Sequence, residues 1–292
     1  MSLRGRFSAR SNPQDSGEIA ALAKSGSLAM TLLGAFMPLN GIKAIFFDLD
    51  GTLRHNIPGG GEIFTEHVRS LGFELSEDDF HRGMRWEFMY WANSSDLIAD
   101  MKKHEGEKFW LNYSYRRLVA LNIPPKQSKS LAPKVSAFMQ EYYTPTSAVP
   151  DDARKALHDL KQHGYTLAVI SNRNEPFTEE LKSFGIADLF EFSLAGGEVD
   201  SYKPEPEIFI HALKRVTGLS AHETIYVGDN YYADVVGSRR AGLRPVLYDP
   251  SRFFPEADCP VIASFDELIP AIKNLGSPAI DGKEPDHKRE NS

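Results

Sequence analysis

Apolar and polar positions follow two different periods along the chain, and the second half of the chain shows both in regular succession. Short apolar runs rich in β-branched and aromatic residues, typical of strands buried on both faces, occupy residues 165–171, 224–229 and 244–248. A further short strand is predicted over 190–194. Amphipathic stretches between these runs predict helices over 151–163, 175–184, 205–216 and 232–241. A capping box at 264–267 predicts the start of a last helix.

The first strand of this series lies much earlier in the chain. Four apolar residues at 44–47 run directly into Asp48-Leu49-Asp50-Gly51, so a buried strand ends in two carboxylates and a turn signal. In an extended strand residues i and i+2 point the same way, so Asp48 and Asp50 converge unless a turn intervenes. Strands that alternate with helices favour right-handed βαβ units. We therefore expect an α/β fold built on a Rossmann-like, doubly wound parallel sheet.

Residues 58–147 carry a helical pattern and no convincing buried strand. Ser76 is a candidate N-cap, and an apolar face follows at i, i+4, i+8 and i+11, formed by Phe80, Met84, Phe88 and Trp91. Two more amphipathic helices are predicted over 105–121 and 131–143, after a glycine-rich, hinge-like loop at 58–61. The region predicts an all-helical cap inserted into a core that comprises residues 41–57 and 148–275.

The two ends of the chain lie outside this pattern. Arg4, Arg6 and Arg10 precede a short apolar run at 28–39, a layout that resembles a targeting peptide but lacks a clear small-x-small cleavage site. We interpret residues 1–40 as an N-terminal extension, either helical or disordered. Residues 276–292 are polar and predict a disordered tail.

Composition limits the partners of the chain. It contains 33 Lys and Arg against 40 Asp and Glu, and the net charge of −7 argues against a nucleic-acid or anionic-membrane surface. No run of about eighteen apolar residues predicts a membrane span. The single cysteine, Cys259, rules out an internal disulfide framework and suits a reducing compartment. We expect a cytoplasmic protein, either a monomer or a homodimer.

Polar residues follow three of the predicted strands. They are Asp48 and Asp50, then Ser171 and Asn172, and then Asp229 with Asp234 five residues later; Lys203 lies in a loop between the last two groups. Parallel strands end at one edge of a sheet, so these side chains are expected to meet there. A carboxylate cluster with one cation is costly unless it holds a divalent metal and an anion.

These residues resemble the four signature motifs of the haloacid dehalogenase superfamily, in the same order along the chain. The motifs here are Asp48-Leu49-Asp50-Gly51-Thr52, Ser171-Asn172, Lys203-Pro204, and Gly228-Asp229 with Asp234. The resemblance covers residues 42–275, and the helical region occupies the place of a cap between the first two motifs. It implies the phosphatase-like branch of the superfamily, a small phosphorylated metabolite as substrate and Mg²⁺ as cofactor.

The resemblance also implies a role for each motif residue. Asp48 is the nucleophile that forms an aspartyl-phosphate, and Lys203 offsets the charge of Asp48 and of the phosphoryl group. Thr52, Ser171, Asn172 and Lys203 contact the phosphoryl oxygens. Mg²⁺ is held by Asp48, by the main-chain carbonyl of Asp50 and by Asp229, while Asp234 orients the metal waters or Lys203.

Asp50 separates two possible chemistries. As a general acid it protonates a leaving alcohol, and as a base it then activates water. A halide leaving group needs no proton, and the true dehalogenases of the superfamily lack an acid at this position, so Asp50 favours phosphate esters. Two alternatives stay open: a phosphomutase acting on a sugar phosphate, and a catalytically silent binding or scaffold protein on the same fold.

The cap carries all three tryptophans, Trp86, Trp91 and Trp110, beside several other aromatic residues. Aromatic residues that fill the core of a small helical bundle are the favoured interpretation, and a stacking surface for a ring-bearing substrate is the alternative. Basic cap residues favour a solvated helix face over an anchor for a second anionic group; they are Arg82, Arg85, Lys102, Lys103, Arg116 and Arg117.

Overall fold

The computed structural model describes residues 39–275. The extension expected over residues 1–40 falls outside this range except for its last two residues, and the tail expected over 276–292 falls wholly outside it. Within the described residues, no helix combines the length and the apolar character needed to cross a membrane.

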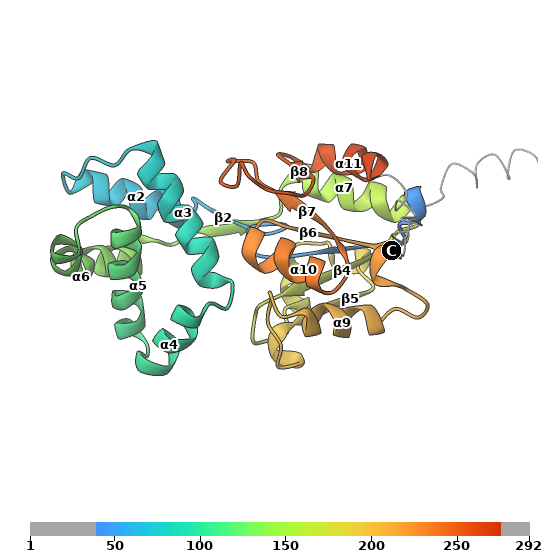
Figure 1. Ribbon diagram of the computed structural model, residues 1–292, viewed down its shortest axis with the longest axis horizontal. Helices are drawn as coiled ribbons and strands as arrows, with labels where there is room; N and C mark the ends of the chain where they lie inside the picture. Colours follow the sequence, from blue (N-terminus) through green and yellow to red (C-terminus); the bar gives the residue numbers. More distant parts are fainter. Residues whose placement is uncertain (1–38, 276–292) are drawn as a thin grey trace, which may run out of the picture. The chain divides into compact units, whose positions relative to one another are not determined.

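The core of the fold is a six-stranded parallel sheet, in the order β5-β4-β1-β6-β7-β8 (Figure 1). The strands are β1 (Ala44–Phe47), β4 (Thr166–Ser171), β5 (Phe192–Ala195), β6 (Thr224–Gly228), β7 (Arg244–Tyr248) and β8 (Val261–Ile262). The predicted α/β class with a doubly wound parallel sheet is confirmed. The two-residue strand β8 was not predicted, because two residues are too few to establish a period.

Helices cover both faces of the sheet, because successive side chains of each strand point to opposite faces. Ile45 and Phe47 of β1 belong to one buried cluster with side chains of α7 (Asp151–Gln162) and α11 (Leu268–Asn274). Ala44 and Phe46 belong to a second cluster with side chains of α9 (Pro206–Lys214) on the other face. Ile45, Phe46 and Phe47 each contribute about 1.5 to 3 kcal/mol by burial, so β1 stabilises the core from both faces.

The strand order places the polar strand ends at the centre of the sheet. Along the chain, the strands after β1 first extend the sheet on one side through β4 and β5, and then on the other through β6, β7 and β8. Ligand sites of open α/β sheets lie where the direction of winding changes, beyond the carboxyl ends of the strands. Here that position lies between the ends of β1 and β6.

Five helices lie between β2 (His55–Ile57) and β3 (Thr146–Ala148), which pair as a two-stranded antiparallel ribbon (Figure 1). We call residues 60–142 the helical insertion. Its helices are α2 (Gly60–Ser70), α3 (Glu77–Trp91), α4 (Ser95–Lys103), α5 (Glu107–Ala120) and α6 (Pro125–Tyr142). Ser76 caps α3 as predicted, accepting a hydrogen bond from the Asp79 amide.

The helical insertion and the ribbon beside it differ from the sequence prediction in four ways. Helix α2 starts within the glycines predicted to form a loop, and α4 was not predicted. Helix α6 starts at Pro125, six residues before its predicted start, because a proline fits the first turn of a helix. The ribbon strands were missed because they are exposed or half-buried and show no apolar run.

Two core elements also differ from the prediction. The helix expected over 232–241 consists of a π-helical turn, Tyr231–Val235, followed by α10 (Val236–Arg240). The Ser264 side chain makes no capping hydrogen bond; instead Glu267 accepts from the Ala263 amide, and a 3₁₀ turn precedes α11. The remaining helix, α8 (Thr178–Ser183), is shorter than its predicted range.

Candidate active site

The loop after β1 brings Asp48 to the centre of the sheet edge and turns Asp50 away from it. The Asp48 amide donates to the Val227 carbonyl at 2.9 Å, which continues the pairing of β1 with β6. The chain then turns at Gly51, whose φ is +91°. A Cβ there would lie 2.1 Å from an Asp229 carboxylate oxygen, so the turn requires glycine. This turn prevents the convergence of Asp48 and Asp50.

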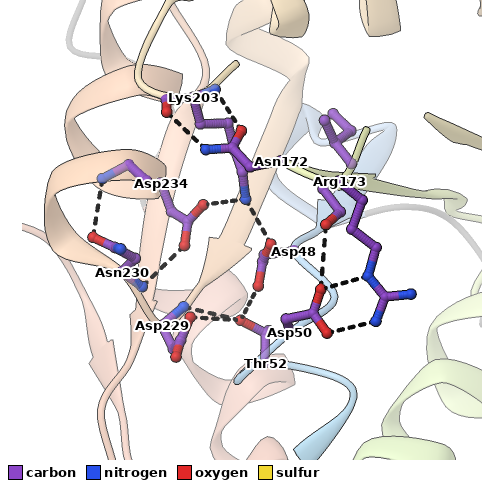
Figure 2. A network of polar contacts seen from close by, with 12 residues as sticks. Asp48, Asp50, Thr52, Asn172, Arg173, Lys203, Asp229, Asn230 and Asp234 are labelled. Atoms are coloured by element: carbon purple, nitrogen blue, oxygen red, sulfur yellow. Dashed lines mark hydrogen bonds and ion pairs between the residues drawn. The ribbon is translucent and has the colours of Figure 1, made fainter. Parts of the chain in front are cut away.

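Three carboxylates meet beyond the ends of β1 and β6 (Figure 2). Oxygens of Asp48, Asp229 and Asp234 all lie within 4.8 Å of one another. Asp234 reaches the cluster from the π-helical turn, where it accepts a hydrogen bond from the Asn230 amide at 2.9 Å. Gly228 makes room for it, because a Cβ at that position would lie 2.3 Å from Asp234.

Lys203 is the cation of this cluster, and it is only 2% exposed. Its Nζ donates to Asp48 Oδ1 and to Asp234 Oδ1, each at 2.6 Å (Figure 2). It also donates to the Tyr226 hydroxyl at 3.0 Å. Asn172 holds the main chain of Lys203: its Oδ1 accepts from the Lys203 amide at 2.6 Å, and its Nδ2 donates to the Lys203 carbonyl at 2.8 Å. The predicted phosphate ligand Asn172 therefore positions the lysine in this structure.

The charges in the cluster do not balance, because three carboxylates share one ammonium group. Burial, with Asp234 and Asp50 nearby, raises the pKa of Asp48 to about 7 against the opposing effect of Lys203. Burial also raises the pKa of Asp229 well above its usual value, as do the Asp48 and Asp234 carboxylates. Burial alone would lower the pKa of Lys203, but Asp234 and Asp48 raise it well above its usual value.

The residues present fit a divalent cation. Carboxylate oxygens are the ligands that Mg²⁺ takes in proteins, and a second cation would relieve the repulsion that adds to burial in raising the pKa values of Asp48 and Asp229. The compact carboxylate group consists of Asp48, Asp229 and Asp234. The side chain of Asp50 is not part of this group.

Thr52 links two members of the cluster and is fully buried. Its hydroxyl accepts from the Asp229 amide at 3.0 Å and donates to Asp48 Oδ2 at 3.1 Å. The sequence predicts Thr52 as a phosphate ligand; the structure instead uses both of these hydrogen bonds to position the two carboxylate residues.

Asp50 lies at the rim of the site, where its side chain is 39% exposed and pairs with two arginines. Arg173 donates to both of its oxygens, from Nη2 at 2.7 Å and from Nε at 2.8 Å (Figure 2). Arg54 donates to Oδ1 at 3.2 Å, and both arginines also pair with Glu180. Ser171, predicted to bind phosphate, donates to Asp50 Oδ2 at 3.4 Å.

Four residues that contact the predicted site residues or their partners were not predicted from the sequence to do so: Arg54, Arg173, Glu180 and Tyr226. Arg173 had a usable signal, because it directly follows the second motif at the end of β4. Glu180 had none, since acidic residues are ordinary in the first turn of a helix. Tyr226 sits within an apolar strand, where a tyrosine is expected simply to fill the core.

A cavity of about 1260 Å³ joins this cluster to the helical insertion. Its core side is lined by Asp48, Lys203 and Asp229, and its other side by residues of α3, α4 and α5. Helix α3 also touches the core, because the Asn230 side chain donates to the Phe88 carbonyl at 2.8 Å. The site can therefore hold an anion at the carboxylate–lysine cluster and a larger group beyond it.

Comparison with known proteins supports this interpretation of the site. The profile of the family described as "haloacid dehalogenase-like hydrolase" matches residues 42–242. The chain is 29% identical to ribulose-1,5-bisphosphate 5-phosphatase of Halopiger xanaduensis, over 71% of this chain and 85% of that protein. It is 29% identical to glyceraldehyde 3-phosphate phosphatase of Pyrococcus furiosus, over 73% and 82%. It is 27% identical to phosphoglycolate phosphatase of Yersinia pseudotuberculosis, over 83% and 97%.

The family profile spans the first three motifs entirely and the fourth together with Asp234, and it also includes the whole helical insertion. The predicted membership, made from the order of these motifs, is confirmed. The chain belongs to the haloacid dehalogenase-like hydrolase family.

Proposed function

We propose that this hydrolase is a Mg²⁺-dependent phosphatase that cleaves a small phosphorylated metabolite through an aspartyl-phosphate intermediate. The observation that carries the proposal is the buried cluster in which Lys203 bridges Asp48 and Asp234 beside Asp229. Three relatives named as phosphatases of phosphorylated metabolites support the substrate class. Phosphoryl transfer depends mainly on positioning and charge neutralisation, and this cluster supplies both.

The first step is attack of an Asp48 carboxylate oxygen on phosphorus. The bond from phosphorus to the alcohol oxygen breaks, and Asp50 as general acid gives its proton to the leaving alkoxide. In the second step Asp50 removes a proton from water, and the hydroxide attacks the aspartyl-phosphate. Inorganic phosphate leaves, and the carboxylate of Asp48 is restored.

Buried groups prepare Asp48 for this attack. Lys203 and Thr52 each hydrogen-bond one of its oxygens, which defines the direction of the carboxylate. Asp234 in turn orients the ammonium group of Lys203. Mg²⁺, held by Asp48, Asp229 and the main-chain carbonyl of Asp50, would neutralise charge on the phosphoryl oxygens when bound.

Asp50 needs to change partners in order to act. Its carboxylate is held by Arg173 in a two-pronged ion pair at 2.7 and 2.8 Å. The pair lies at the rim, partly exposed, where ion pairs contribute little stability and exchange partners at low cost. We infer that Asp50 leaves Arg173 when an ester occupies the cluster. Ser171, the last residue of β4, then contacts the phosphoryl group.

Phosphate release from p-nitrophenyl phosphate, measured with Mg²⁺ and again with EDTA, tests the proposal. Turnover should require Mg²⁺ and should be lost in Asp48→Asn, whereas the exposed Asp188→Asn provides a matched control with parental activity. Turnover that persists in EDTA would refute the metal-dependent mechanism.

The same assay separates the alternative functions. A phosphomutase would need a bisphosphate activator and would form an isomer of its substrate instead of free phosphate. A scaffold protein would hydrolyse none of a panel of phosphorylated metabolites. The charged residues of the cluster argue against a scaffold, because a buried, unbalanced set of charges is costly to keep without chemical use.

A further inference from the structure

The part of the cavity inside the helical insertion is bounded by large apolar side chains that remain exposed. Four of them come from three different helices: Trp91, Ile98, Met101 and Trp110. They are 37%, 39%, 56% and 46% exposed, respectively. We call these four residues the apolar wall. Exposed apolar side chains that gather in one cavity mark a ligand site more often than singly scattered ones do.

Packing within the insertion does not account for the apolar wall. The same three helices already form a buried aromatic cluster, in which Tyr90, Leu97 and Tyr113 are at most 7% exposed. Trp86 packs against this cluster, as the sequence interpretation favoured for all three tryptophans. Trp91 and Trp110 lie at its edge and leave more than a third of their surface open. Leaving such apolar surface in water forfeits the stabilisation that its burial would give.

Few cations in the cavity are free to bind a second anionic group of the substrate. Among the described residues, the lysines and arginines that line it are Arg54, Lys102, Arg117, Arg173 and Lys203. Four of the five keep a carboxylate partner of the protein even when Asp50 leaves Arg173, because Arg54 and Arg173 also pair with Glu180. Arg117, for example, is almost fully buried and lies 2.6 Å from Glu87. Lys102 is the exception, and it is exposed near the end of α4.

The volume of the cavity agrees with these two observations. Pockets for drug-sized ligands usually enclose about 300 to 1,000 Å³. An alcohol of two or three carbons would fill only a small part of the roughly 1260 Å³ available.

From these observations we infer that the natural substrate is the phosphate monoester of a bulky, predominantly apolar alcohol that carries no second anionic group. Its phosphate lies at Asp48 and Lys203, and its apolar part lies against the apolar wall. This inference rests on the proposed phosphatase function and specifies its substrate class.

A series of esters tests the inference. Phenyl phosphate and 1-naphthyl phosphate have similar leaving groups but differ in apolar size, and phosphoglycolate carries a second anion. With Mg²⁺ present, we expect kcat/KM for 1-naphthyl phosphate to exceed that for phenyl phosphate by about tenfold or more, because added apolar contact of this size is worth that much. Phosphoglycolate should be the poorest of the three.

Variants of the apolar wall then locate the effect. Trp91→Ala and Met101→Ala should each lower kcat/KM for 1-naphthyl phosphate by about tenfold, with at most a small change for phenyl phosphate. Met89→Ala is the matched control, because Met89 is 43% exposed on α3 but does not line the cavity. It should leave the preference unchanged. Met101 is the more exposed of the two positions, so its variant keeps the test valid if Trp91→Ala unfolds.

Three results would overturn the inference. Phosphoglycolate could be the best substrate, with Lys102→Ala lowering its turnover. The wall variants could lower turnover of all esters equally, which would mean that the wall packs against protein. The third is equal binding of 1-naphthyl phosphate and phosphoglycolate to Asp48→Asn, measured by calorimetry. That binding assay is independent of turnover: tight, selective binding of the naphthyl ester without hydrolysis by the parent enzyme would refute the phosphatase function alone.

Discussion

Asp229→Asn should make the metal-free protein more stable while removing its response to Mg²⁺. Three carboxylates within 4.8 Å of one another share a single ammonium group. The variant removes one negative charge but keeps the side-chain oxygen that lies 3.4 Å from the Thr52 hydroxyl. It therefore removes repulsion with little change in shape.

The magnitude follows from the distance. Two unit charges 4.8 Å apart repel by about 3.5 kcal/mol at an effective dielectric constant of about 20. Attraction to Lys203 offsets part of this repulsion, and solvent at the partly exposed Asp229 screens it further. We expect a net gain of about 1 to 3 kcal/mol in the free energy of unfolding, or roughly 2 to 10 °C in melting temperature.

The gain should grow with pH. The pKa of Asp229 is raised in the folded protein above the 3.8 of the unfolded chain, so the folded state holds the proton more tightly. The parent therefore loses stability as the pH rises from 3.8 towards the folded-state pKa, and the asparagine variant escapes this loss. Thermal unfolding in EDTA at about pH 5 and about pH 8 measures the difference.

Mg²⁺ gives a second, independent readout. Saturating Mg²⁺ should raise the melting temperature of the parent by mass action and should raise that of Asp229→Asn much less. Asp249→Asn is the matched control: that buried carboxylate accepts hydrogen bonds from the Phe253 and Phe254 amides, so its variant should lose stability. If Asp229→Asn melts at or below the parent in EDTA at the higher pH, the negative charge of Asp229 does not destabilise the folded protein.

Three further predictions concern single positions. Asp50→Asn should accumulate the aspartyl-phosphate, detectable by mass spectrometry after acid quench, and a variant with the parental hydrolysis rate would remove Asp50 from its role. Gly51→Ala should lose activity because its Cβ would collide with Asp229, whereas Gly72→Ala, at the same φ of +91° but in open space, should cost only about 1 to 2 kcal/mol of stability in denaturant titration. Arg117→Ala removes the cationic partner of Glu87 and should cost about 3 to 5 kcal/mol, against about 1 kcal/mol at most for the exposed Arg82→Ala; equal losses would contradict this.

The part of the site that could be predicted from the sequence is the part that strand ends determine. Asp48, Asn172 and Asp229 directly follow β1, β4 and β6, and neighbouring parallel strands must bring their ends together. Asp234 does not directly follow a strand, because it lies in the π-helical turn after β6. It lies only six residues after the end of β6, so its position near the site could still be predicted.

Side-chain direction could not be predicted in the same way. The period of two that makes Asp48 and Asp50 parallel holds only while the strand continues, and β1 ends at Phe47. After the turn, Asp50 finds Arg173, which is 123 residues further along the chain. A local pattern carries no information about such a pair, because it depends on how two loops fold over neighbouring strand ends.

The helical insertion shows why specificity is harder to infer than chemistry. Amphipathic spacing predicts which face of α3 is apolar, but it gives the same pattern whether that face meets another helix or a cavity. Trp86 and Trp91 lie on one helix, five residues apart; Trp86 is partly buried against aromatic rings, whereas Trp91 is more exposed and lines the cavity. The residues proposed to act on the phosphate group are acidic or basic, so they can be recognised in the sequence. The proposed apolar end would be recognised by the surface that the folding of α3, α4 and α5 leaves uncovered, and amphipathic spacing does not show which surface that is.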